Sequence, residues 1–113
     1  DNKPSSIAKQ ILSELKNITN PNVVVGGISY KKNVNDIRES PALKIIEYLK
    51  TKNVKVAIYD PIVYPKNKSN LLKLCKKKDL LIILVNHDKI INELKTNKKQ
   101  IGSVLNLNKV MIY

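Results

Sequence analysis

Short apolar runs divide the chain and predict buried strands. Residues 23–28 and 80–85 are continuously apolar, as expected of strands covered on both faces of a parallel sheet. Residues 54–59 instead alternate between apolar and other side chains, which predicts a strand with one wetter face near a sheet edge. Residues 109–113 predict a last strand. The pattern therefore indicates four strands, with the first and third at the centre.

Apolar residues at helical spacing separate the strands. Ser5 or Ser6 can cap a leading helix, and residues 17–22 break it. Ser69 is the expected cap of a short third helix. Residues 96–108 are too mixed in character to assign. The apolar positions of these two helices are Ile7, Ile11, Leu12 and Leu15, and then Leu71, Leu72, Leu74 and Cys75.

The second helix has the clearest boundaries. Ser40 followed by Pro41 gives an N-cap and a favoured first helical residue, and Asn53 can end the helix in a left-handed conformation. A fourth helix opens at residues 86–88. The apolar positions of the second and fourth helices are Ala42, Ile45, Ile46 and Leu49, and then Ile90, Ile91 and Leu94.

Helices and strands alternating in this way predict an α/β fold. We expect a three-layer, Rossmann-like parallel sheet with right-handed crossovers, helices on both faces and strand order 2-1-3-4. We expect residues 1–113 to form a single domain, with a leading helix and linker in 1–21 and the α/β core in 22–113. The order reverses between strands one and three, and ligands of such sheets bind at the carboxyl ends of strands beside that point.

Composition narrows the class of protein. The chain has 113 residues, a net charge of +12, a single Cys and a single Arg. One Cys excludes a disulfide framework and a Cys-based zinc site. The longest apolar run is too short to span a bilayer, which predicts a cytoplasmic protein with no membrane partner. Because the first residue is Asp rather than Met, we expect an excised part of a longer chain.

A charged loop follows the first strand, and it carries the candidate binding residues. Lys31 is the candidate phosphate contact, because an ammonium beside free loop amides suits an anion; an exposed surface lysine is the equal alternative. Arg38, the only Arg, is expected to brace the loop through Asp36 and Glu39 more than to contact a ligand. Tyr30 either packs beside the ligand or covers the end of the sheet.

Other polar residues predict structural roles. Gly26 and Gly27 do not begin a dinucleotide fingerprint, which needs three glycines and an immediate helix, so we expect them to allow close backbone approach to a neighbouring element or a ligand. Asp60, before a proline, is expected to end a strand. His87 is expected to begin a helix, and a contact with ligand is the less favoured alternative. Cys75 is expected in the core. No carboxylate pair, nucleophile–base pair or metal cluster is apparent, so no catalytic residue and no metal site are predicted.

A long run of residues resembles a known family. Gly27-Ile-Ser-Tyr-Lys-Lys-Asn-Val-Asn-Asp-Ile-Arg-Glu-Ser-Pro-Ala-Leu, followed by Tyr59-Asp60-Pro61, is similar to the C-terminal domain of the UDP-glucose/GDP-mannose dehydrogenase family. Tyr30-Lys31 with Arg-Glu-Ser-Pro resembles most the members that act on UDP-N-acetylmannosamine or UDP-N-acetylglucosamine. The resemblance covers nearly the whole chain.

The resemblance implies a role as one part of a larger enzyme. Members of the family oxidise the C6 hydroxyl of a UDP-sugar to a carboxylate in two steps that reduce NAD, and the C-terminal domain binds UDP. By position, Lys31 is implied as the diphosphate contact and Tyr30 as its neighbour at the nucleotide, with Asp36 and Arg38 shaping the loop. The NAD domain and the catalytic cysteine are not in this chain, and the chain ends where an Asp-x-Arg segment usually follows.

These departures set our expectations for the isolated chain. It should bind no cofactor and be inactive alone, whereas the full-length enzyme should use NAD, contact its other domains and form a homo-oligomer. Two alternatives stay open. A basic α/β module could bind nucleic acid, although scattered Lys residues without interleaved aromatic side chains favour solvated faces and no nucleic-acid partner. A regulatory nucleotide-binding module is the other.

Overall fold

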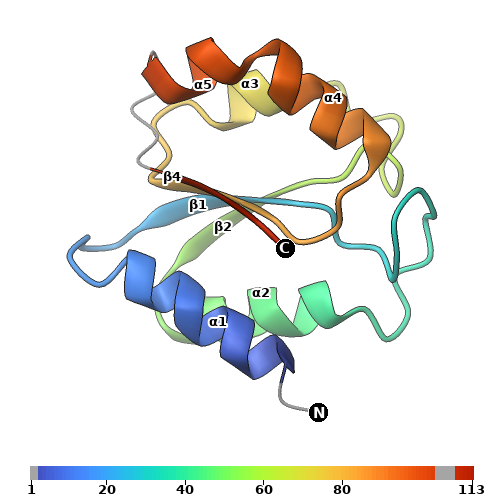
Figure 1. The fold of residues 1–113 in the computed structure, drawn as a ribbon. Helices are drawn as coiled ribbons and strands as arrows, with labels where there is room; N and C mark the ends of the chain where they lie inside the picture. Colours follow the sequence, from blue (N-terminus) through green and yellow to red (C-terminus); the bar gives the residue numbers. More distant parts are fainter. Residues whose placement is uncertain (1–2, 104–108) are drawn as a thin grey trace.

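A four-stranded parallel sheet forms the middle layer of the molecule. The computed structural model describes residues 3–103 and 109–113. Figure 1 shows α1 and α2 on one face of the sheet and α3, α4 and α5 on the other. The elements are α1 (Lys3–Glu14), β1 (Asn22–Gly26), α2 (Pro41–Thr51), β2 (Lys55–Tyr59), α3 (Leu71–Leu74), β3 (Leu80–Ile83), α4 (Asp88–Thr96), α5 (Lys98–Ser103) and β4 (Lys109–Ile112).

The strand order is β2-β1-β3-β4, as predicted, and all three strand pairs are parallel. Val24 of β1 lies opposite Ala57 of β2 and Leu81 of β3. The two central strands are fully buried along their apolar residues, whereas β2 at the edge begins with an exposed Lys55. The three-layer Rossmann-like architecture inferred from the pattern is therefore confirmed.

Two hydrophobic clusters hold the layers together. Val23 and Val25 of β1 face the cluster under α1 and α2, and Val24 faces the cluster under α3, α4 and α5. Successive side chains of a strand point to opposite faces, so a strand covered on both sides must be apolar throughout. Burying each large aliphatic side chain contributes about 1.5–3 kcal/mol. The continuous run in 23–28 is thus explained by burial on both faces.

Several helix boundaries differ from their predictions. Helix α1 starts at Lys3, so Ser5 and Ser6 lie in its first turns and are exposed rather than capping. Asn70, not Ser69, caps α3, and its side chain accepts from Lys73 N at 2.8 Å. Both errors arise because several capping residues lie close together, and the pattern cannot choose among them.

The described part of the region left unassigned contains a further helix. Helix α5 occupies Lys98–Ser103 and follows α4 directly, with the Ile101 N–H donating to Asn97 O. The rest of that region, 104–108, lies outside the described residues. Asn53 has φ +64°, which confirms the predicted left-handed end of α2. No helix in the described residues is long and apolar enough to cross a membrane.

Candidate functional site

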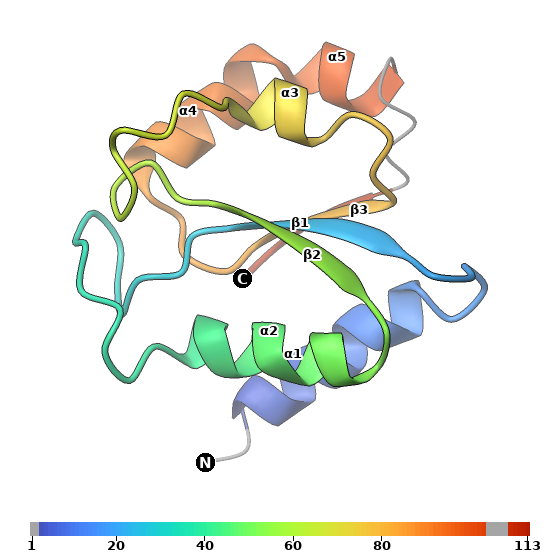
Figure 2. The same cartoon turned by 180° about the vertical axis from the view of Figure 1, so that it is seen from behind.

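The carboxyl ends of the strands gather at one edge of the sheet, where the loop after β1 leaves towards α2. Figures 1 and 2 show this loop beside the segments that follow β2 and β3. Gly27 begins the loop with φ +87°, and its N–H donates to Tyr59 O at 2.9 Å. A Cβ at Gly27 would lie 2.3 Å from Val85 O. The loop therefore starts in close backbone contact with the segment after β3.

Contacts between nearby residues shape the outer part of the loop. The Tyr30 N–H donates to Asp36 O at 2.6 Å and closes a turn. Arg38 donates from Nε and Nη2 to the two carboxylate oxygens of Asp36 at 3.0 and 2.9 Å. These side-chain hydrogen bonds lower the pKa of Asp36 to about 2 and raise that of Arg38. Glu39 follows with φ +55°, which turns the chain into the cap of α2.

Ser40 joins the loop to α2. Its Oγ accepts from Ala42 N and donates to Ser29 O, each at 3.2 Å. Ser40 and Pro41 thus form the predicted start of the helix, as the N-cap and its first residue. Because Ser40 is buried and contacts Ser29, the helix start also ties the two ends of the loop together.

A buried polar cluster lies beneath the loop, formed by Asp60 and His87. The Asp60 carboxylate accepts from Ile28 N at 2.8 Å and contacts His87 Nε2 at 2.9 Å. It also accepts from Ile62 N and Val63 N at 3.0 and 2.9 Å, which is the strand-ending turn predicted for Asp60. The side chains of Asp60 and His87 have no exposed surface. The cluster links the ends of β1, β2 and β3.

The segment after β3 holds the middle of the loop. The Asn33 N–H donates to His87 Nδ1 at 2.8 Å. The Asn33 side chain exchanges two hydrogen bonds with Asp88, each at 3.0 Å, and Lys32 lies 3.2 Å from the same carboxylate. The hydrogen bond from Asn33 and the cation of Lys32 lower the pKa of Asp88. Residues 32 and 33 are thus fixed to the start of α4.

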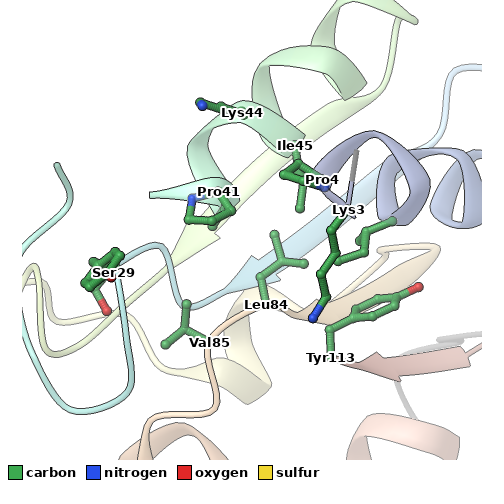
Figure 3. Close-up of a pocket in the computed structure, with 12 residues that line it drawn as sticks. Lys3, Pro4, Ser29, Pro41, Lys44, Ile45, Leu84, Val85 and Tyr113 are labelled. Atoms are coloured by element: carbon green, nitrogen blue, oxygen red, sulfur yellow. The ribbon is translucent and has the colours of Figure 1, made fainter. Parts of the chain in front are cut away.

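A groove of about 420 Å³ opens beside the loop on the α1 and α2 side of the sheet. Figure 3 shows Leu84 and Val85 in its floor, with Ser29 to one side and Tyr113 to the other. Tyr30, which is 59% exposed, also lines it. Lys3 and Lys44 supply positive charge at its wall. The groove is therefore mainly apolar with cationic edges.

The candidate residues fall into two groups. Tyr30 lines the groove, whereas Lys31, Asp36, Arg38 and Glu39 lie further along the loop and do not line it. The side chain of Lys31 is exposed. His87, predicted as a helix-entry residue, precedes α4 as its N-cap, but its imidazole makes no capping hydrogen bond and points into the buried cluster instead.

Sequence reasoning missed the joint role of Asp60 and His87. Each has a local explanation, a turn before proline and a helix entry, and only the parallel sheet brings them together across 27 positions. Cys75 is buried as predicted, and burial raises the pKa of its thiol to about 11. The described residues hold no cluster of three metal-ligating side chains.

Comparisons with known proteins identify the family of this chain, and the matched residues include the loop after β1. Residues 24–111 match the model of the UDP-glucose/GDP-mannose dehydrogenase family, UDP binding domain. UDP-N-acetyl-D-mannosamine dehydrogenase of Methanococcus aeolicus is 37% identical over 99% of this chain and 26% of its own length. The same enzyme of Methanococcus vannielii is 38% identical over 88% of this chain and 23% of its own length.

A solved structure has the same fold over nearly the whole chain. The structure of UDP-D-ManNAc dehydrogenase from Pyrococcus horikoshii superposes with a TM-score of 0.80 and 25% sequence identity. The match covers 98% of this chain and 27% of that protein. The chain therefore spans about a quarter of the length of the relatives it matches.

Proposed function

The chain belongs to the UDP-glucose/GDP-mannose dehydrogenase family, as its UDP binding domain, and we propose that it binds the UDP part of a sugar substrate within a larger oxidoreductase. The observation that carries this proposal is the exposed Lys31 on a loop fixed at the switch point of the sheet. Ligands of open α/β sheets bind in the crevice at that point.

Each loop residue has a distinct part in the proposal. The Lys31 ammonium contacts the diphosphate, because it is exposed to incoming ligand and an ammonium forms charge-assisted hydrogen bonds with phosphate oxygens. Tyr30 lines the groove beside it and contacts the nucleotide. Asp36, Arg38 and Glu39 shape the loop through the ion pair and the left-handed residue before α2.

The parent enzyme supplies the chemistry in this proposal. It oxidises a UDP-sugar at C6 with NAD, and the names of the relatives favour UDP-N-acetyl-D-mannosamine as the sugar nucleotide. NAD does not fit this domain: Gly27 is followed by a polar loop, and α2 starts only at Pro41, so no glycine-rich turn leads directly into a helix. Residues 1–113 act as one binding domain that contacts the other domains of a homo-oligomeric parent.

Titration of the 113-residue chain with UDP tests the proposal. We expect binding with chemical-shift changes in residues 29–39, and affinity at least about tenfold lower in Lys31→Ala, since a hydrogen bond to a charged group contributes roughly 1.5–3 kcal/mol. Lys95→Ala, an exposed change in the last turn of α4, is the matched control and should keep the affinity.

Uridine separates phosphate recognition from nucleoside recognition. Its affinity should be the same in the wild type and in Lys31→Ala, because it carries no phosphate for the ammonium to contact. A UDP titration that leaves residues 29–39 unchanged, or a Lys31→Ala chain that binds UDP as tightly as the wild type, would contradict the proposal.

A further inference from the structure

His87 lies under the middle of the loop, and its surroundings assign its ring proton. The Asn33 N–H donates to Nδ1, so Nδ1 has no proton of its own in this geometry. Nε2 faces Asp60 Oδ2 at 2.9 Å and Ser29 Oγ at 3.3 Å. Since the Ser29 hydroxyl donates to Lys31 O, its oxygen is left to accept. The imidazole is therefore the neutral Nε2–H form, oriented by Asp60.

The same cluster contacts the main chain before and after Lys31. Ser29 Oγ donates to the carbonyl of Lys31 itself at 2.7 Å, and His87 accepts from the next residue but one. Asp60 accepts from Ile28 N and so holds the start of the loop. One buried His–Asp pair thus reaches the main chain before and after Lys31, whose own side chain remains exposed.

Capping of α4 does not explain this burial. His87 occupies the N-cap position, yet its side chain makes no capping hydrogen bond. Placing an imidazole and a carboxylate where neither is exposed is unfavourable unless their hydrogen bonds are made. Apart from the bond between the two side chains, these bonds go to the loop after β1 and to the turn after β2.

We propose that His87, oriented by Asp60, is a positioning residue that presents Lys31 to the diphosphate. The pair holds the loop in its binding conformation before the ligand arrives. Ordering one backbone residue costs about 1–2 kcal/mol, so a loop released at Asn33 must be ordered again on binding and would bind more weakly. The proposal rests on the proposed function in one respect, that Lys31 contacts phosphate.

Two substitutions separate the two nitrogens of the imidazole. In His87→Gln the amide nitrogen can replace Nε2 and donate to Asp60, but the acceptor for Asn33 N–H is lost. In His87→Asn the amide oxygen can replace Nδ1 and accept from Asn33 N–H, but the donor to Asp60 is lost. We expect His87→Gln to bind UDP about tenfold more weakly, and His87→Asn to stay within about threefold of the wild type.

A double-mutant cycle distinguishes positioning from a general structural role. If His87 acts through Lys31, His87→Gln weakens UDP binding in the wild type and causes little further loss in Lys31→Ala. Equal losses in both backgrounds, or a His87→Gln chain with wild-type affinity, would overturn the proposal. Lys95→Ala again serves as the control that should leave the cycle unchanged.

Measurements without UDP test the contact between His87 and the loop by itself. The imidazole ¹⁵N spectrum should show the proton on Nε2, and the Asn33 amide should exchange slowly in the wild type and His87→Asn but quickly in His87→Gln. A proton on Nδ1, or a rapidly exchanging Asn33 amide in the wild type, would overturn the proposal even if a variant does not fold. Absence of UDP binding by the wild type would instead contradict the proposed function. The imidazole spectrum and the exchange rate of the Asn33 amide would still show whether His87 holds the loop.

Discussion

Gly27 is a position in the loop where a side chain has no room. Its φ of +87° is unfavourable for L-amino acids, and an added Cβ would meet the backbone oxygen of Val85 at 2.3 Å. Backbone cannot rotate away as a side chain can. We therefore expect Gly27→Ala to lower the free energy of unfolding by roughly 3 kcal/mol or more, measured by urea denaturation.

Gly26 provides the matched comparison within the same sequence. A Cβ there would meet Ile83 Cδ1 at 2.9 Å, the far end of a flexible side chain, and no positive φ is involved. Gly26→Ala should therefore cost clearly less than Gly27→Ala. Equal losses from the two changes would show that the contact with Val85 does not limit the position.

Individual side chains differ in how far the sequence could place them. The Asp36–Arg38 contact joins residues two positions apart, and it is one of the two pairings that the spacing offered. In the described residues Arg38 pairs with Asp36 and not with Glu39. The glycines were expected to allow close approach to an element or a ligand, and Gly27 approaches the element after β3. The contact of His87 with Asp60 could not be predicted, because it exists only when three strand ends meet.

The loop between β1 and α2 is held by contacts of two kinds. Asp36 and Arg38 form its exposed outer brace, and the buried pair beneath it fixes its inner side. Exposed ion pairs add little to overall stability, since solvent screens them. The effect of the Asp36–Arg38 ion pair is local, on the shape of residues 30–38. A titration of the Asp36 carboxyl can therefore follow this outer brace without unfolding the chain.

The charge state of Asp36 should report on the outer brace. Its pKa is lowered to about 2 in the folded chain from an ordinary value of 3.8. The stabilisation that its contact with Arg38 gives the folded loop is therefore complete above about pH 4 and is lost as pH falls through about 2. An NMR titration of the Asp36 carboxyl carbon and the Arg38 amide should show this midpoint. Arg38→Gln should return the pKa of Asp36 towards 3.8.

Lys95→Ala is the control for that titration, because it removes a cation from α4 without touching the loop, and it should leave the midpoint unchanged. A wild-type midpoint near 3.8 would mean that the Arg38 contact does not persist in solution. The UDP titration of the Arg38→Gln chain then measures how far the outer brace matters for binding.

Secondary elements were predicted best where two signals agreed. Burial on both faces marked β1 and β3, and Ser40 with Pro41 marked the start of α2. Strand lengths were overestimated, since β1 ends at Gly26 and β3 at Ile83 while the apolar runs continue. Ile28 remains apolar because it is buried, and Leu84 and Val85 because they line the groove. Backbone contacts persist there, since the N–H groups of Gly27 and Leu84 still donate to neighbouring strands.

Parallel topology is what turns these separate signals into one site. The order β2-β1-β3-β4 places the ends of the first three strands side by side, so Asp60, His87 and the loop after β1 meet although they are far apart in the sequence. The same order directs the crossovers to opposite faces, as Figure 2 shows, and ligands of such sheets bind at the carboxyl edge between them.

The net charge of +12 belongs to the whole molecule rather than to one surface. Exposed lysines occur on α1 and α2 on one face, on α4 and α5 on the other, and on β2 and β4 at the two sheet edges. A nucleic-acid interface would be expected to gather cations along one face. The distribution therefore favours local recognition of UDP over tracking of a nucleic-acid backbone.

Salt dependence separates these two modes of binding. A protein that neutralises 6–10 phosphates loses about 10³–10⁵ in affinity between 50 and 200 mM salt, whereas one or two lysines at a diphosphate should give a loss of no more than about tenfold. We expect UDP titrations by calorimetry to follow the shallow dependence, and any complex with a mixed-sequence oligonucleotide to vanish by 200 mM salt. An oligonucleotide complex that persists at 200 mM, survives Lys31→Ala and is not displaced by saturating UDP would favour the nucleic-acid alternative, because it would place the dominant anion contact outside the loop after β1.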